Sequence, residues 1–357
     1  MQKRFLFRIH SFSGLLSGIF IVLMSLSGAA LVFHEELDAL QYPVIKQQPN
    51  LPLLTVDSCY RSLQKEFPKA QISSCNLAEN TAKPFIFSVY DSSYKKGSQT
   101  MQVFLHPQTA EVLWFRGGGK DRQHNFMAWL TVFHNSLHLK KTGEWILGFF
   151  GVLFLLSLCT GIVHYRKKII PVLLFKKPLY RSSNLHQLVG VYALLFNLMI
   201  GATGVWMQRY VFTKDFYAAS QPYTPVIKTS APLSYSLDSA IKQVQQQHPA
   251  FSAHVIYFAG SPKGKTAVYG SRATNAFIHN KKFADAVFLD SAGALNKTAF
   301  VTEIIPENRR DIINAQIHYG RYGGWPVKLL YTLFGLSGGL LSITGFVLWQ
   351  KRKQLTF

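Results

Sequence analysis

Charged residues are scarce in this 357-residue chain, and acidic residues are the scarcest of them. Asp and Glu number 17 against 38 Lys and Arg, which leaves a net charge of +21, and the four types together make up only 15% of the chain. Hydrophobic residues account for 48%. So little charge beside so much apolar sequence indicates a membrane protein that also has soluble parts.

Nucleotide-binding motifs are also missing, and cysteines are few. No Gly-x-Gly-x-x-Gly motif follows a predicted strand, so an electron-transfer role would need a separate cytoplasmic donor or quinol. Of the three cysteines, Cys59 and Cys75 are sixteen residues apart in a segment expected outside the cytoplasm, where a disulfide can form. Two unpaired thiols are the alternative. Cys159 lies in an apolar span and is assigned to packing.

Four apolar stretches are each long enough to cross the membrane, which takes about 20 residues. They are His10–Phe33, Trp145–Val163, His186–Trp206 and Val327–Trp349. Basic residues gather before the first stretch, between the second and third, and after the fourth. The positive-inside rule therefore makes these three segments cytoplasmic and places the two long connections outside. This placement explains much of the basic excess, so we expect no nucleic acid as a partner.

The predicted fold is an all-α membrane four-helix bundle with a two-fold internal repeat, joined to two external α+β domains. In the second external domain, Ser236 caps an amphipathic helix that Pro249 ends, and alternating strands follow; the first domain repeats this order from Thr55. The predicted segments are membrane helix 1 (1–34), external domain 1 (35–132), membrane helix 2 with an external extension (133–165), a basic cytoplasmic loop (166–185), membrane helix 3 (186–207), external domain 2 (208–316), membrane helix 4 with an external extension (317–350) and a cytoplasmic tail (351–357).

Histidines stand at matching positions in the two halves. His10 and His186 each precede glycines by four and eighteen residues, and His134 and His318 each precede a glycine by seventeen and a Thr-Gly pair by twenty-six. The repeat therefore predicts two pairs, His10 with His186 and His134 with His318, at opposite ends of the bundle. Paired imidazoles inside a bundle indicate a metal cofactor, above all haem iron, because facing helices build such sites from neutral imidazoles.

Three further histidines have no counterpart in the other half and are secondary candidates for a haem site. His164 lies at the cytoplasmic edge, where it could replace a ligand or hold a haem propionate. His138 is one helical turn from His134, and His34 ends the first span on the external side. The glycines near the main pairs would let a porphyrin approach, although ordinary helix packing explains them equally well. The basic loop 116–122 could meet an anionic chelate or be a plain linker.

These motifs resemble the iron-regulated membrane proteins with PepSY-associated transmembrane helices, some of which are siderophore ferric reductases of bacterial inner membranes. The resemblance implies two b-type haems, PepSY-like external domains in the periplasm, and electron flow from the cytoplasm to a ferric siderophore or other ferric chelate. It covers nearly the whole chain and lies in Arg8-Ile-His10-Ser-Phe-Ser-Gly14, Phe133-His134-Asn-Ser-Leu, Leu158–Tyr165, Asn184-Leu-His186-Gln-Leu-Val-Gly190, Ile317-His318-Tyr-Gly-Arg and Ile343–Trp349.

Three functions are compatible with this sequence. The first is haem-dependent reduction of a ferric chelate outside the inner membrane. The second is a non-enzymatic accessory or sensor protein whose external domains bind a ligand or another protein. The third is a transporter subunit whose histidines line a metal or proton path. An absorption spectrum of the purified protein distinguishes the first from the other two.

Overall fold

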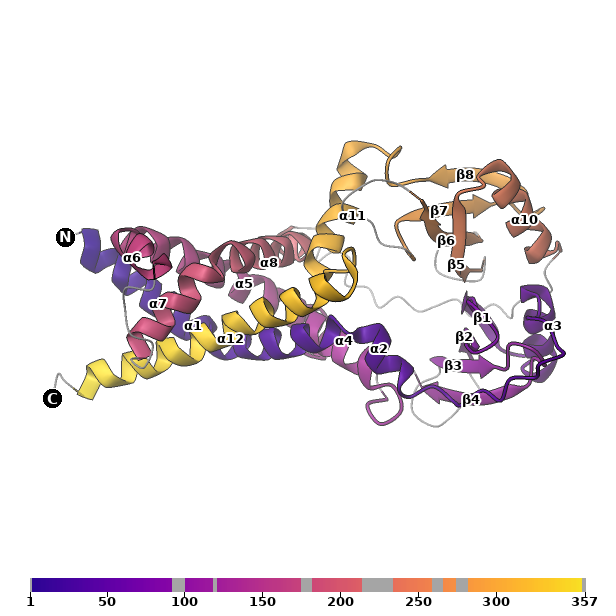
Figure 1. The fold of residues 1–357 in the computed structure, drawn as a ribbon, viewed down its shortest axis with the longest axis horizontal. Helices are drawn as coiled ribbons and strands as arrows, with labels where there is room; N and C mark the ends of the chain where they lie inside the picture. Colours follow the sequence, from indigo (N-terminus) through magenta and orange to yellow (C-terminus); the bar gives the residue numbers. More distant parts are fainter. Residues whose placement is uncertain are drawn as a thin grey trace. The chain divides into compact units, whose positions relative to one another are not determined.

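The computed structural model describes residues 2–91, 100–117, 121–174, 182–213, 234–258, 266–273 and 282–354. The chain forms two compact units that alternate along the sequence (Figure 1). We call them the helical unit (Met1–His34, Leu130–Gln221 and Asn314–Phe357) and the sheet unit (Glu35–Trp129 and Pro222–Ile313).

Three helices of the helical unit are long and apolar enough to cross a membrane: α1 (Gln2–Leu31), α5 (Lys140–Tyr165) and α12 (Gly324–Gln354). Helix α1 packs against both α5 and α12. The third predicted span is instead two helices, α7 (Ser182–Tyr192) and α8 (Leu194–Met207), which reach spanning length only together and are bent by 66°. Three predicted spans are thus single helices, and one is a bent pair.

Asn197 contacts the break between α7 and α8. Its backbone N–H and its side-chain Nδ2 both donate to the carbonyl of Ala193, at 2.8 and 3.0 Å. Nδ2 also donates to Ser337 Oγ on α12, at 2.8 Å. The carbonyl at the break therefore accepts two hydrogen bonds, and the second helix of the pair is joined to α12. The number of apolar residues in this segment predicts that it can span a membrane, but it does not predict whether the segment is one straight helix or a bent pair.

Two short helices, α4 (Phe126–Ser136) and α11 (Pro306–Tyr319), carry His134 and His318 and end before the next long helix begins. The chain after α4 turns through three non-glycine residues with positive φ, and the chain after α11 turns through two glycines with positive φ. Such left-handed residues end helices. Each histidine helix is therefore separated from the long helix that follows it. Further short helices are α2 (His34–Ala39), η1 (Arg166–Lys168), α6 (Ile169–Leu173) and η2 (Arg209–Phe212).

One antiparallel sheet runs through the whole sheet unit, in the order β4-β3-β2-β1-β5-β6-β7-β8. Its strands are β1 (Gln71–Asn76), β2 (Phe85–Tyr90), β3 (Thr100–Leu105), β4 (Val112–Gly117), β5 (Phe251–Tyr257), β6 (Ala267–Arg272), β7 (Asp285–Leu289) and β8 (Leu295–Ala299). The two external domains, predicted with a sheet each, join through β1 and β5, where Cys75 lies opposite Ile256. Taken alone, each half would have an edge strand with unpaired backbone N–H and C=O groups. The pairing of β1 with β5 gives these groups hydrogen-bond partners.

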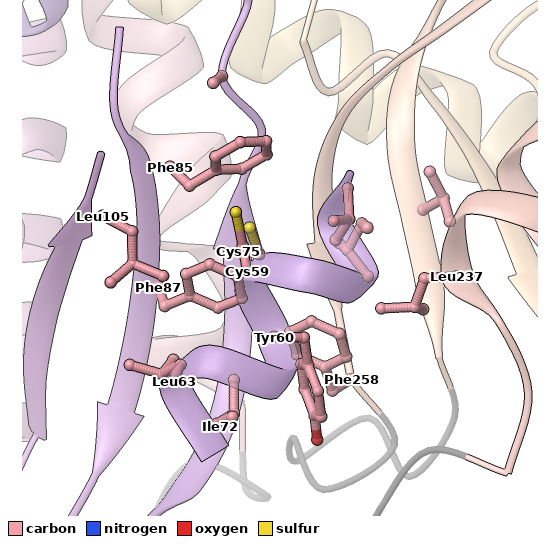
Figure 2. Close-up of a cluster of buried hydrophobic side chains, with 14 of the residues drawn as sticks. Cys59, Tyr60, Leu63, Ile72, Cys75, Phe85, Phe87, Leu105, Leu237 and Phe258 are labelled. Atoms are coloured by element: carbon pink, nitrogen blue, oxygen red, sulfur yellow. The ribbon is translucent and has the colours of Figure 1, made fainter. Parts of the chain in front are cut away.

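Helices α3 (Val56–Glu66) and α10 (Leu237–Gln247) pack over this sheet and share one hydrophobic core with it. Figure 2 shows the centre of that core, which contains Leu63 of α3, Leu237 of α10 and strand residues such as Phe87 of β2. The predicted cap is confirmed, since Ser236 Oγ accepts from the N–H of Ser239 at 3.1 Å.

The first turns of α3 and α10 cap each other. Asp57 of α3 accepts hydrogen bonds from Ser236 Oγ and from the N–H of Leu237, at 2.5 and 2.8 Å. Asp238 of α10 accepts from the N–H groups of Val56 and Asp57, at 3.0 and 2.8 Å. Carboxylates at helix N-termini are favourable because the exposed N–H groups point at them. The two halves of the unit are therefore tied together by two acids as well as by the sheet.

We expect Asp57→Asn to loosen these first turns at neutral pH more than Asp238→Asn does. Burial raises the pKa of Asp57, but the hydrogen bonds from Ser236, Leu237 and Asp238 outweigh it, so the net pKa is lowered. A lowered carboxyl pKa contributes stability above about pH 4, which is lost as the pH falls through the folded pKa. Burial raises the pKa of Asp238, with a contribution from Asp57, so its stabilising effect is greatest at low pH and declines as the pH rises.

Hydrogen exchange of the full-length protein measures this difference. At pH 7, Asp57→Asn should speed exchange in the first turn of α10 about tenfold, since a hydrogen bond to a charged group contributes about 1.5–3 kcal/mol. Asp238→Asn, which keeps an acceptor and removes a neighbouring charge, is the matched control. Equal acceleration in both variants would contradict the assignment.

Candidate cofactor sites in the helical unit

The first histidine pair consists of His10 on α1 and His186 on α7. Their ring centres are 6.3 Å apart and their planes make an angle of 72°. The Nδ1 atom of His10 lies 2.8 Å from the backbone carbonyl of Ser157 on α5. The Nδ1 atom of His186 lies 2.9 Å from Thr344 Oγ1 on α12. Four different helices therefore position this pair.

The second histidine pair consists of His134 on α4 and His318 on α11. Their ring centres are 6.4 Å apart and their planes make an angle of 49°. The Nδ1 atom of His134 lies 2.8 Å from Ser27 Oγ on α1, and that of His318 lies 3.0 Å from Thr203 Oγ1 on α8. The two predicted pairings are thus the two that the structure brings together.

The hydrogen bonds define which nitrogen of each imidazole carries the proton. Ser27, Thr203 and Thr344 each donate the hydroxyl proton to the backbone carbonyl four residues earlier, at 2.7, 2.7 and 2.8 Å. Each hydroxyl must then accept from the histidine Nδ1–H. The carbonyl partner of His10 can only accept. In their neutral form all four rings therefore hold the proton on Nδ1 and leave the lone pair of Nε2 available to a metal.

A glycine lies against the edge of every one of these rings. A Cβ atom added at three of these glycines would come within 3.1 to 3.2 Å of the ring Cε1 of its histidine and press on the imidazole, whereas one at Gly345 would make ordinary contact at 3.5 Å. The contacts are Gly161 with His10, Gly28 with His134, Gly204 with His318, and Gly345 with His186. Glycines at repeated positions of the sequence thus leave the space that the histidine rings occupy.

The orienting hydroxyls were missed at the sequence level, although a signal for them exists. A Ser-Gly or Thr-Gly dipeptide occurs at a matching position in each predicted span: Ser27-Gly28, Thr160-Gly161, Thr203-Gly204 and Thr344-Gly345. In three of the four, the hydroxyl contacts the histidine and the glycine makes room for it. His10 is the exception, because it uses the carbonyl of Ser157.

The two pairs lie at different levels of α1. His10 belongs to the first pair, and Gly28, eighteen residues later on the same unbroken helix, contacts the second pair. That separation corresponds to a rise of about 27 Å, at about 1.5 Å per residue. The break after α4 makes this possible, because His134 lies beside α1 rather than on a straight extension of α5.

A cavity of about 490 Å³ adjoins the first pair. Both histidines line it, together with Gly14 and Gly190. Its other walls are mostly apolar side chains of α1, α5, α7 and α12, and two cationic residues, Lys168 and Arg352, lie among them. A cavity of this size lies within the range of small-molecule and cofactor sites, which is about 300–1,000 Å³.

The geometry of both pairs fits a metal bound between two imidazoles. With metal–nitrogen bonds of about 2.0 Å, an imidazole–metal–imidazole unit places its ring centres about 6 Å apart. The observed 6.3 and 6.4 Å agree with this. Two imidazoles fill two coordination positions, so the remaining ones would come from the group that carries the metal, as in a porphyrin. The two histidines of each pair could therefore hold the iron of a haem.

The three secondary candidates do not belong to the two pairs, although His164 and His10 both contact the ring of Tyr165. The ring of His164 contacts those of Phe7 and Tyr165, at 5.3 and 4.6 Å between ring centres, and His164 is not among the residues that line the cavity. His138 was expected one helical turn beyond His134, but α4 ends at Ser136 and His138 has a φ of 59°, so the two do not share a helix. His34 is the first residue of α2.

Cys59 and Cys75 lie in the core of the sheet unit with their sulfur atoms next to each other (Figure 2). Both are free thiols in the structure. Burial raises the pKa of Cys59 to about 12, with a contribution from Asp238, and burial raises the pKa of Cys75 as well. These thiols are therefore not reactive nucleophiles. The disulfide between them stays a prediction.

Arg116 does not form part of an exposed basic loop. Only 3% of its side chain is exposed, and its two terminal nitrogens donate to both oxygens of Asp38, at 2.8 and 2.6 Å. The strand β4 extends to Gly117, so Arg116 points into the unit from the sheet. It cannot meet a chelate from solution. Residues 118–120 of the predicted loop lie outside the described residues.

The chain combines apolar helices long enough to span a membrane with a separate sheet unit. This combination defines the class: a membrane protein with a second, mixed α/β unit. Residues 7–352 match the family described as the PepSY-associated TM region, and the chain belongs to this family. A comparison with curated proteins finds no match.

Proposed function

We propose that this protein is a haem-dependent oxidoreductase of the bacterial inner membrane. It would carry electrons from the cytoplasmic side to a ferric siderophore, or another ferric chelate, in the periplasm. The observation that supports this most directly is the matched geometry of the two histidine pairs, with ring centres 6.3 and 6.4 Å apart. Haem, when bound, supplies an iron that takes up and releases one electron.

His10 and His186 would hold one b-type haem, and His134 and His318 the other. The Nδ1 hydrogen bonds leave each Nε2 available to bind the iron, and such partners raise the basicity of the ligand. The helices around the first site line it mostly with apolar side chains. The separation of about 27 Å along α1 approaches the thickness of the hydrocarbon layer, about 30 Å. Electrons could therefore enter near one membrane face and leave near the other.

The proposed orientation in the membrane rests on a fourth span and on the distribution of basic residues along the chain. We take the bent α7–α8 pair as that span, which completes a four-helix bundle with a two-fold repeat and puts both termini on the same side. The basic termini and the basic segment 166–181 support a cytoplasmic location for that side. The sheet unit then lies in the periplasm, where its proposed task is to position the ferric chelate.

The reaction needs a donor and an acceptor outside this chain. One electron from a cytoplasmic donor or from quinol passes to the ferric iron of the chelate, which becomes ferrous. Oxygen chelators hold the harder ferric ion more tightly, so reduction releases the iron. Without an acceptor for electrons, the same fold would serve as a non-enzymatic accessory or sensor protein.

The purified, dithionite-reduced protein should be reoxidised by a ferric siderophore, and a ferrous-specific chelator should trap the product. The expected result is loss of the reduced haem bands together with formation of one trapped ferrous iron per electron. A gallium siderophore of the same shape is the matched control, because gallium accepts no electron under these conditions. A folded protein that binds no haem would contradict the cofactor. A haem protein that stays reduced with a panel of ferric chelates would favour the accessory or sensor function.

A further inference from the structure

The cavity beside the first histidine pair has charged side chains of one sign only. Lys168 of η1 and Arg352 of α12 line it, and none of the described residues that line it is acidic. Both cations lie at the same end of the helical unit as His10 and His186. A cavity of this kind suits a largely apolar ligand that carries two negative charges at one edge.

We infer that Lys168 and Arg352 bind the two propionate carboxylates of the haem held by His10 and His186; this rests on the proposed function. Arginine binds carboxylates through two parallel N–H donors, and lysine binds them as a point charge. Together they define which edge of the macrocycle faces the basic end of the helices. His164, the propionate partner that the sequence suggests, does not line the cavity.

Aromatic rings hold both cations at the cavity wall. The guanidinium of Arg352 lies 4.3 Å from the ring centre of Phe7, and the ammonium of Lys168 lies 5.4 Å from that of Tyr165. Phe7 and Tyr165 line the same cavity. Cation–π contacts of this length restrain a long side chain. Both side chains are exposed, so these contacts favour their positions at the cavity without fixing them.

Esterification removes the negative charges of the propionates and leaves the porphyrin ring unchanged. The test uses haem and haem dimethyl ester, titrated into full-length apoprotein carrying His318→Ala so that only the first site is filled. Each affinity is read from the Soret band and corrected for partition into protein-free micelles. We expect the first site to bind haem at least about tenfold more tightly than the ester, because charged hydrogen bonds are the strong ones. Adding Lys168→Gln and Arg352→Gln should abolish that preference.

Lys167→Gln with Lys351→Gln is the matched control, since it removes two charges of the same segments that do not line the cavity. The preference for haem should survive in this control. Equal affinity for haem and ester in the His318→Ala protein would overturn the inference without any further substitution, and would indicate that the cations bind another anion such as a lipid phosphate. A preference that persists in Lys168→Gln/Arg352→Gln would overturn it too. Failure of the proposed function is distinguishable, because then neither porphyrin binds through the histidines.

Discussion

Replacing His318 by Ala is expected to halve the haem content of the purified protein and to leave the remaining haem spectrally intact. A b-type haem has no covalent link to the chain, so it depends on its axial ligands and its pocket. His318 shares the second site with His134 alone, at 6.4 Å between ring centres, and the first site lies about 27 Å away along α1. Loss of one ligand should therefore empty one site and not disturb the other. A pyridine haemochrome assay per mole of protein measures this.

The other histidine replacements complete the test. His134→Ala should reproduce the His318→Ala result, whereas His10→Ala and His186→Ala should empty the first site instead. His34→Ala is the matched control, because His34 belongs to α2 and to neither pair. If His164→Ala removes the first haem while His10→Ala does not, the pairing proposed for that site is wrong.

Asp38→Asn is expected to destabilise the sheet unit by about 3–5 kcal/mol, the cost of removing one partner of a buried ion pair. The Asp38 and Arg116 side chains are only 7% and 3% exposed and form a bidentate pair. Arg116 Nε also donates to Gln102 Oε1 at 2.8 Å, and its guanidinium lies near the rings of Tyr42 and Phe104. The arginine has no route to water, so without the carboxylate its charge would be buried and unpaired.

Chemical unfolding of the full-length protein in detergent, followed by hydrogen exchange of the strands of the sheet unit, measures this loss. The double variant Asp38→Leu with Arg116→Met is the matched control. It should cost much less than Asp38→Asn, because replacing both charges by apolar groups leaves no unpaired ion. If the single and double variants are equally destabilised, the pair acts through packing and not through charge.

Local patterns in the sequence were sufficient for much of the architecture. Apolar length predicts the spans, because crossing hydrocarbon requires about 20 apolar residues whatever the neighbours are. The cap at Ser236 and the helix-then-strands order of each half follow from short-range hydrogen bonding and periodicity. The spacing repeat also selected the four histidines that meet in two pairs, since duplicated segments place equivalent residues at equivalent positions.

Tertiary structure alone decided the contacts between segments far apart in the chain. The partner of each Nδ1 atom lies on a different helix, and so does the glycine that each ring contacts. The pairing of β1 with β5 merges two expected domains, and Asn197 beside the bend bonds Ser337 of another helix. Burial reversed the expected role of Arg116, because Asp38 lies 78 residues away in sequence and beside it in space. Propensity and periodicity act over a few residues, whereas these contacts exist only once the chain is packed.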